Sequence, residues 1–335
     1  MLHDLEQSSQ LTKWLYTLDA LERCRARANL EARKAMATKE DSQKASTGDA
    51  AQPHQPLIPA QNFAANFASH NQTSSSSTNS PMEEDGPLES SSGMPLLMPH
   101  EETMIVTFYA SKIPSLIGPL AQVPRLRRDI QVAATASMLF RRFFLSNSVM
   151  VFDPKAIMVA ASFLASKSEE AMVDVRYLEE GTKKMDAPVP KEEIIPAELA
   201  LAKGVDFDLL CFHPRQAVLA LTEDLISFLK SERGQALASF REEDDAHNRI
   251  VKGPDLKPTH DEARKMMDDV IVSDIPLLCS PGQVGIAALM VANETLLKSS
   301  TPEQPVPRID WWGYVQSRFQ DKQDKFNALQ HKVSV

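Results

Sequence analysis

Residues 154–165, PKAIMVAASFLA, and residues 281–292, PGQVGIAALMVA, decide the fold of this chain. Both begin with Pro and carry a β-branched residue three positions on, two alanines six and seven positions on, and Ala eleven positions on. Proline is tolerated in the first turn of a helix, and alanines let neighbouring helices approach closely. Each stretch therefore predicts a helix at the centre of a bundle. Because the second begins 127 residues after the first, the pair indicates two similar all-α domains, with two unrelated buried helices as the alternative.

The composition also favours helices. The 335 residues include only 11 glycines, 6% are aromatic, and Ala, Leu, Met and charged helix formers are abundant. A hydrophobic content of 43% is enough to fill the cores of two ordinary domains. The formal net charge of −9 argues against a broad nucleic-acid-binding surface, although it is compatible with a local basic patch. We therefore expect an all-α protein whose partners are other proteins.

The cysteines and the missing motifs argue against metal and enzyme chemistry. Cys24, Cys211 and Cys279 lie far apart, none is in a C-x-x-C pair, and we expect core thiols in a reducing compartment. The chain has no phosphate-binding loop, zinc-protease motif or serine-hydrolase motif, and it lacks the signatures of a kinase catalytic domain. It shows no signal peptide and no apolar run long enough to span a bilayer. We expect a soluble intracellular protein that is not an enzyme and needs no cofactor or metal.

Changes in composition divide the chain into predicted segments. Apolar residues at helical spacing predict one helix over residues 9–36, and the Ser-, Thr-, Asn- and Pro-rich stretch that follows cannot bury enough apolar surface to fold. From Pro99 onward, helical patterns alternate with proline-rich breaks. The segments are an N-terminal helix (1–37), a disordered linker (38–98), a first helical domain (99–212), a second (213–300) and a C-terminal helix (301–335).

The last segment and the scattered polar residues receive structural interpretations. A helical stripe predicts that the C-terminal helix closes the second domain, with docking of a third subunit as the alternative. The stripe consists of Ile309, Trp312, Val315, Phe319, Phe326 and Leu329. His213 lies in a turn, and solvent exposure is the default interpretation for His247, His260, Asp224 and the acidic residues 242–245.

Several longer stretches resemble the cyclin box. Residues 131–170 look like a cyclin box, and within them FRRFFLSNSVMVFDP (140–154) is especially similar to cyclins of the H type, the regulatory subunits of the CDK-activating kinase. The resemblance extends to PAELALAKGVDFDLLCFHP (196–214), VSDIPLLCSPGQVGIAALMVA (272–292), MPHEETMIVTFYASKI (98–113) and SSQLTKWLYTLDALERCRARAN (8–29). It covers most of residues 9–36 and 98–295 and leaves the linker unmatched.

The resemblance implies a fold, a function and partners. The fold would be all-α, with two five-helix cyclin-box repeats and flanking N- and C-terminal helices. The protein would bind and activate a cyclin-dependent kinase catalytic subunit, together with a RING-finger assembly factor, within the transcription factor TFIIH. The substrates of that kinase would be the C-terminal domain of RNA polymerase II and the activation loops of other such kinases. A nuclear location follows, with no direct contact to nucleic acid or membrane.

The resemblance also implies the residues that contact the kinase. Lys167, in ASKSEE, matches the cyclin-box lysine, and Glu198, in PAELAL, matches its glutamate. A lysine at a helix end offers three N–H donors to main-chain carbonyls, and a carboxylate complements it by accepting N–H bonds. Phe163, Leu164 and Glu170 are further candidates for the kinase interface. Without the resemblance, Lys167 would be interpreted as a solvated lysine at a helix end. Phe163 and Leu164 would be core residues, and Glu169 and Glu170 would belong to a solvated loop.

Two departures from the cell-cycle cyclins leave alternatives open. Ile105 stands where those cyclins carry Arg after Met, and Arg141 stands where they carry Asp, so their substrate-docking patch is in doubt here. The departures favour a transcription-linked type, and a C-type or K-type cyclin is an alternative to the H type. A nucleic-acid-binding factor with the same repeated fold, like the TFIIB core, is the alternative from another class; it predicts a basic surface and usually a zinc ribbon.

Overall fold

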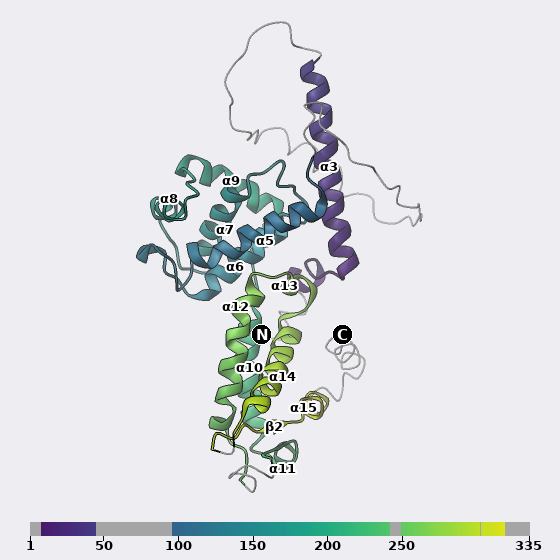
Figure 1. Ribbon diagram of the computed structural model, residues 1–335, viewed down its shortest axis with the longest axis vertical. Coiled ribbons are helices and arrows are strands. Elements are labelled where there is room, and N and C mark those ends of the chain that lie inside the picture. The colour runs from purple at the N-terminus through teal and green to yellow at the C-terminus, as the bar shows by residue number, and fades with distance from the viewer. Residues whose placement is uncertain (1–7, 45–95, 242–248, 302, 319–335) are drawn as a thin grey trace, which may run out of the picture. The chain divides into compact units, whose positions relative to one another are not determined.

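The computed structural model describes residues 8–44, 96–241, 249–301 and 303–318, and these form two compact units (Figure 1). The first unit contains residues 17–210, and the second contains residues up to Tyr16 together with residues from Cys211 onward. Outside the described residues lie most of the predicted linker, His247, the acidic residues 242–245, and Phe319, Phe326 and Leu329 of the C-terminal stripe. The predictions for those positions stay predictions.

The first unit is a helical bundle built around one central helix. α7 (Pro154–Ser168) contacts α5, α6, α8 and α9, and its residues 156–166 are all buried. A long N-terminal helix, α3, contacts α5. The bounds are α3 (Leu18–Lys44), α5 (Pro99–Leu116), the 3-10 turn η1 (Pro124–Leu126), α6 (Ile130–Phe143), α8 (Val175–Lys184) and α9 (Lys191–Gly204).

The second unit repeats this arrangement around α14 (Pro281–Ser299). This helix contacts α10, α12 and α13, and the buried side chains of the unit form one hydrophobic core. The other elements are α2 (Ser9–Thr12), α10 (Pro214–Phe228), α11 (Glu232–Gln235), β1 (Ala238–Ser239), η2 (Gly253–Leu256), α12 (Lys257–Ile271), α13 (Ile275–Leu278), β2 (Arg308–Ile309) and α15 (Trp311–Arg318). In the described part of the chain, the only sheet is the two-residue pairing of β1 with β2.

The two central helices begin as their sequences predict. Pro154 and Pro281 occupy the first helical turn, and the side chains of Asp153 and Ser280 accept hydrogen bonds from the backbone N–H groups of Lys155 and Gln283. Glycine at 285 lets α14 approach α10 closely, since a Cβ there would lie 3.0 Å from Cβ of Ala217. The prediction of two central helices with small residues at their contacts is confirmed.

The prediction of one continuous helix over residues 9–36 is wrong. The structure has a short α2, a break, and then α3, which extends to Lys44 and so past the predicted boundary at residue 37. In the break, the N–H of Tyr16 donates to the carbonyl of Leu277 at 2.8 Å, and the indole of Trp14 is buried. These tertiary contacts replace the intrahelical hydrogen bonds, and Leu18, predicted on the apolar stripe, is 63% exposed.

The C-terminal stripe is also corrected in its detail. Ile309 lies in β2, paired with Ala238, and not in a helix. The buried face of α15 consists of Trp311, Tyr314 and Val315, which join the core of the second unit, while Trp312 packs at its edge. The described part of the segment therefore packs on the second unit, as predicted. Of the predicted stripe, Val315 lies on the buried face of α15, while Trp311 takes the place expected for Trp312.

Three polar residues have structural roles that the sequence did not indicate. His213 is buried, although it lies in a turn. His260 lies in α12 within 3.1 Å of the Thr222 hydroxyl, and burial lowers its pKa. Asp224 accepts hydrogen bonds from Tyr314 and Arg318 and so ties α15 to α10. Asp224 is therefore engaged in a contact between helices and is not simply a solvated residue, and His260 is only partly exposed.

Candidate functional site

The central helix of the first unit determines where Lys167 reaches the surface. Residues 156–166 of α7 are buried, so the helix can leave the core only in its last turn. Lys167 lies in that turn, where the helix dipole favours a cation, and its side chain is 35% exposed. The length of the buried part of α7 therefore fixes the position of the ammonium group.

Lys167 and Glu198 form a close pair. The Nζ of Lys167 donates to both carboxylate oxygens of Glu198, at 2.7 Å from Oε1 and 3.0 Å from Oε2. The same Nζ lies 3.9 Å from the centre of the Phe163 ring, within range of a cation–π interaction. The Glu198 side chain is only 15% exposed. The pair joins the end of α7 to the middle of α9, and both residues keep hydrogen-bonding capacity for a partner's main chain.

The other predicted interface residues differ in their exposure. Phe163 and Leu164 are both 7% exposed, so each packs mainly inside this unit. The ring of Phe163 contacts the ammonium group of Lys167. Glu170 is exposed and has a left-handed backbone with φ of 55°. Glu169 is not a solvated loop residue, because its carboxylate accepts hydrogen bonds from Gln131 at 2.7 Å and from Thr135 at 2.5 Å. Glu169 therefore fixes the end of α7 to α6.

Exposed apolar side chains on α9 were missed by the sequence analysis. Ile195 and Leu199 are each 52% exposed, and their spacing of four residues places them on one face of α9, near Glu198. Phe207 and Leu210, which follow α9, are 62% and 65% exposed. Large apolar side chains gathered on one surface mark protein contacts. The sequence of α9 could have revealed these exposed residues. The buried face of the helix consists of Ile194, Ala197, Leu201 and Ala202, and Ile195 and Leu199 are additional apolar residues outside that face.

Arg142 supports the site from within. It is completely buried in α6, and its Nη1 donates to the carbonyl of Asp208 at 3.1 Å, which holds the chain just after α9. Arg141, beside it, is 3% exposed. The sequence FRRFF is consistent with buried arginines, because two arginines between phenylalanines are unusual on a solvated helix face.

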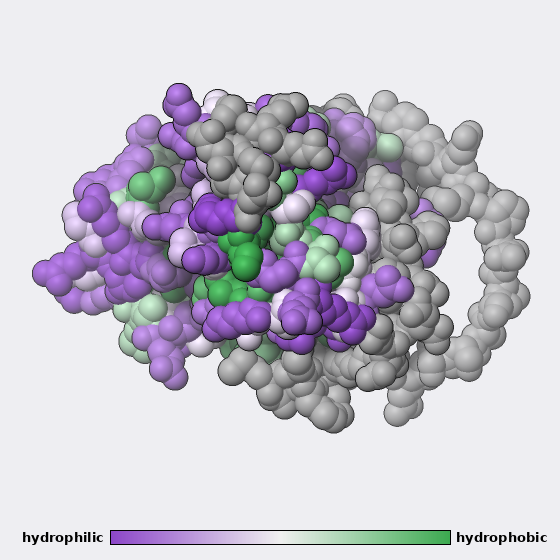
Figure 2. Space-filling view, turned by 90° about the horizontal axis from the view of Figure 1, so that it is seen from below, coloured by the Kyte–Doolittle hydropathy of each residue, from purple (hydrophilic) through white to green (hydrophobic). Residues whose placement is uncertain are grey.

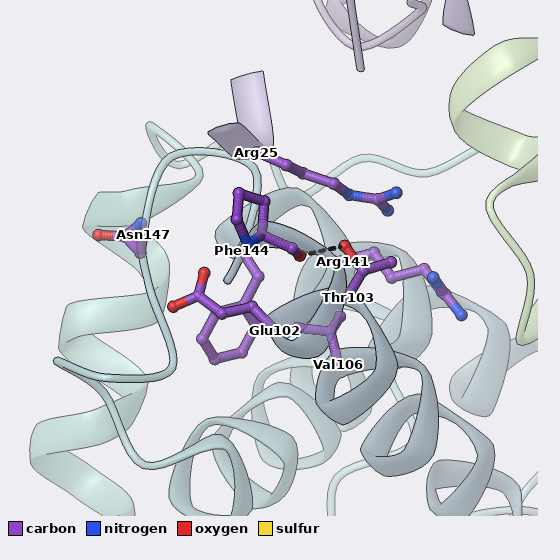
Figure 3. A pocket seen from close by; sticks show the side chains of 8 residues that line it. Arg25, Glu102, Thr103, Val106, Arg141, Phe144 and Asn147 are labelled. Carbon is purple, nitrogen blue, oxygen red and sulfur yellow. Dashed lines mark hydrogen bonds between the residues drawn. The ribbon is translucent and has the colours of Figure 1, made fainter. Parts of the chain in front are cut away.

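A small cavity at the junction of α3, α5 and α6 has no room for a cofactor (Figure 3). Its volume is about 10 Å³, which is about the space of one water molecule. The guanidinium groups of Arg25 and Arg141 extend to one side, and the carboxylate of Glu102 lies on the other. Glu102 accepts a hydrogen bond from the Ser148 hydroxyl, and burial raises its pKa. This cluster is a structural joint between helices.

The described residues show neither a metal-binding cluster nor a membrane-spanning helix. Among them, no three His, Cys, Asp or Glu side chains are grouped so that they could hold a metal ion. None of the described helices combines the length and the apolar character that crossing a bilayer requires. What these residues do present is the Lys167–Glu198 pair and, on the same helix as Glu198, the exposed apolar side chains of Ile195 and Leu199.

The sequence is similar to that of several cyclins, although no family model matches it. It is 28% identical to cyclin CCL1 of Saccharomyces cerevisiae over 204 residues, which are 61% of this chain and 44% of the relative. It is 28% identical to cyclin-H1-1 of Arabidopsis thaliana over 198 residues, 58% of this chain and 50% of the relative. Cyclin-C1-1 of Oryza sativa subsp. japonica is 34% identical over 113 residues, 32% of this chain and 43% of the relative. The chain thus spans about half the length of the curated relatives it matches.

Two solved structures share the fold. A chain in the CAK complex of Chaetomium thermophilum bound to ATP-gamma-S matches with a TM-score of 0.62 and 19% identity, over 98% of this chain and 76% of that one. A chain in the yeast TFIIK (Kin28/Ccl1/Tfb3) complex matches with a TM-score of 0.54 and 21% identity, over 98% and 97%.

The fold is thus that of a cyclin, with two cyclin-box repeats and flanking helices, and the predicted fold class is confirmed. Among the cyclins, the chain is similar in sequence to those of the H type, as the stretch from Phe140 to Pro154 predicted.

Proposed function

We propose that this protein is a cyclin H-like regulatory subunit that binds and activates a cyclin-dependent kinase, without a catalytic site of its own. The observation that carries the proposal is the Lys167–Glu198 pair, held at the surface between α7 and α9 of a cyclin fold. The similarity to cyclin-H1-1 and to CCL1 supports the H type. The substrates of the complex would be the C-terminal domain of RNA polymerase II and the activation loops of other cyclin-dependent kinases.

In this proposal, binding of the cyclin shifts the population of kinase molecules toward the active conformation. Lys167 and Glu198 would bond to main-chain groups at the kinase helix that carries the ATP-site glutamate, and so hold it in the active position. Ile195 and Leu199 would add apolar area around the charged pair, with Phe163 and Leu164 supporting it and Glu170 at its edge. A partly buried ion pair contributes little to stability, because desolvation offsets the Coulomb attraction. Its use here is to set the geometry of the contact.

The partners beyond the kinase follow from the relatives. The yeast structure that shares the fold contains Kin28, Ccl1 and Tfb3 in one TFIIK complex, which favours a TFIIH-related assembly for this chain too. A RING-finger assembly factor would be the third member, and the location would be the nucleus. The net charge of −9 argues against direct binding to nucleic acid, and no contact with a membrane is proposed.

The first test is co-purification of the full chain with candidate kinases, followed by kinase assays with and without it. Lys167→Glu should abolish kinase retention and stimulation, because it places two carboxylates against each other at the contact. The variant should still fold with a melting temperature close to that of the wild type, since desolvation offsets much of the Coulomb attraction in a partly buried pair. Lys257→Glu, an exposed lysine at the start of α12, is the matched control and should bind normally.

The outcomes separate the alternatives. Retention of a C-type or K-type partner kinase in place of the H-type one would correct the kinase and keep the class. Undiminished kinase binding by Lys167→Glu would refute the assigned role of the pair. If Lys167→Glu failed to fold, Glu198→Gln, which keeps the shape of the side chain, would test the contact in its place.

A further inference from the structure

The second unit carries a groove that the kinase contact does not use. It lies between the end of α10, the start of α11 and residues 250–253, and its volume is about 660 Å³. We call it the α10–α11 groove, lined chiefly by Ile226, Leu229, Lys230, Ile250, Val251 and Lys252. Figure 2 views the molecule from the end that carries α11, and hydrophobic surface there lies within a mostly hydrophilic face. The volume is in the range of sites that hold small ligands or a few side chains.

The floor of the groove is apolar, and hydrogen bonds link its two walls. Leu229 and Val251 are 3% and 1% exposed, whereas Ile250 is 61% exposed at the edge. The amide of Gln235 donates to the carbonyl of Leu229 and, at 3.1 Å, to the carbonyl of Val251, so it links the two walls. The groove is therefore part of the folded unit, and a partner would not need to open it.

The rim of the groove is positively charged. Lys230 and Lys252 are exposed, and neither forms an ion pair within the part of the chain that the structure describes. Arg249 is paired with Asp255 at 2.8 Å, so that carboxylate is already engaged. Glu232 is the one carboxylate among the lining residues. The rim therefore carries two ammonium groups and one carboxylate, a local excess of positive charge on a chain whose net charge is −9.

We propose that the α10–α11 groove binds a short acidic segment of a partner protein, with an apolar side chain on its floor and carboxylates against Lys230 and Lys252. Charge complementarity selects such a segment, because carboxylates on the partner would complete ion pairs that this chain leaves open. The apolar floor supplies the anchor that most peptide contacts need. The site is on the second unit, so it goes beyond the proposed kinase contact on the first. Residues 242–245 of this chain, EEDD, are the competing occupant.

The test uses the full chain and a fluorescein-labelled peptide, DDELFDD, in a fluorescence polarisation titration. Lys230→Glu/Lys252→Glu should weaken binding roughly tenfold or more, and high salt should weaken wild-type binding. Ile250→Ser, at an exposed position, should weaken it without unfolding the protein. The control peptides KKKLFKK and DDESSDD should not bind, and Lys257→Glu should bind like the wild type.

Equal affinity of the groove variants and the wild type, or binding of KKKLFKK as tight as that of DDELFDD, would overturn the proposal. Peptide binding that appears only after residues 242–245 are changed to Asn and Gln would also overturn it, in favour of the chain's own acidic residues. The two proposals are tested separately: the groove variants should still stimulate the kinase, and Lys167→Glu should still bind the peptide.

Discussion

Asp224 illustrates how one carboxylate can join two helices that are far apart in sequence. The Tyr314 hydroxyl donates to it at 2.6 Å and the Nε of Arg318 at 2.8 Å, while the Arg318 guanidinium also lies over the ring of Phe228. The hydrogen bonds from Arg318 lower the pKa of Asp224, and burial together with Asp224 raises the pKa of Tyr314. This cluster anchors α15 to α10.

Replacing Asp224 should make the stability of the second unit less sensitive to pH. The folded pKa of Asp224 lies below its usual value of 3.8, so its contribution to stability is fully present above that pH and is lost as the pH falls through the folded pKa. Asp224→Asn should therefore cost about 1 kcal/mol near neutral pH, a small figure because the pair is partly exposed. The difference in unfolding free energy from the wild type should shrink below pH 3.8, as measured by urea titration. A difference that stays constant down to the lowest pH would contradict this role.

For single residues, the sequence predicts which side chains belong to the site better than it predicts the burial and the hydrogen bonds of each. Lys167 and Glu198 could be found because each lies in a short stretch that resembles the cyclin box, and the structure brings them together. The engagement of Glu169 depends on Gln131 and Thr135 of α6, which lies elsewhere in the sequence. Such environments are set by tertiary contacts that no local pattern contains.

At the element scale, α14 depends on a close approach to α10. A Cβ at position 285 would lie 3.0 Å from Cβ of Ala217 and 3.1 Å from the backbone N of Val218. At position 282, one turn earlier in the same helix, a Cβ would meet nothing within 4 Å. The two glycines therefore separate the effect of packing from the effect of backbone entropy.

Gly285→Val should lower the unfolding free energy of the second unit by about 1–3 kcal/mol, because the added side chain pushes α14 away from the backbone of α10. Gly282→Ala, the matched control, should be neutral or raise it by about 0.5 kcal/mol, since Ala restricts the unfolded chain. Thermal unfolding followed by circular dichroism would measure both changes. Equal effects of the two substitutions would refute the packing explanation.

The elements that could be predicted are those with local start signals. Proline in the first turn and a capping side chain define α7 and α14 wherever the rest of the chain goes. The break after α2 and the strand β2 could not be predicted, because each is stabilised by residues distant in sequence. Tyr16 bonds to Leu277, and Ile309 pairs with Ala238. The helical periodicity of apolar residues continues through both places, so the sequence pattern does not indicate that the helix is interrupted there.

At the scale of the whole molecule, the chain passes twice through the second unit. Residues up to Tyr16 belong to it, the next residues to 210 form the first unit, and the chain then returns. The side chain of Gln10 accepts from the N–H of Phe212 at 2.7 Å and donates to its carbonyl at 2.9 Å. These bonds fasten the N-terminal residues to the start of the later segment.

Gln10→Ala/Trp14→Ala should destabilise the second unit more than the first. The change leaves the N–H and carbonyl of Phe212 unpaired and removes a buried indole, losses of about 1–3 and 3–5 kcal/mol in other proteins. Hydrogen exchange should accelerate around Phe212 and α13, with amides of α6 and α7 unchanged. Leu18→Ala, at a 63% exposed position, is the control and should leave exchange unchanged. Uniform acceleration in both units would contradict this division.

The divided second unit has a consequence for synthesis on the ribosome. The first unit is continuous from residue 17 to residue 210, so it can fold as soon as that stretch has emerged from the exit tunnel. Gln10 and Trp14 emerge before it, yet the backbone of Phe212 and Leu277 that this segment needs is made much later. The earliest described residues of the chain therefore reach their native contacts only after residues 212 to 277 have been made, and the Trp14 indole stays outside its native core during that time.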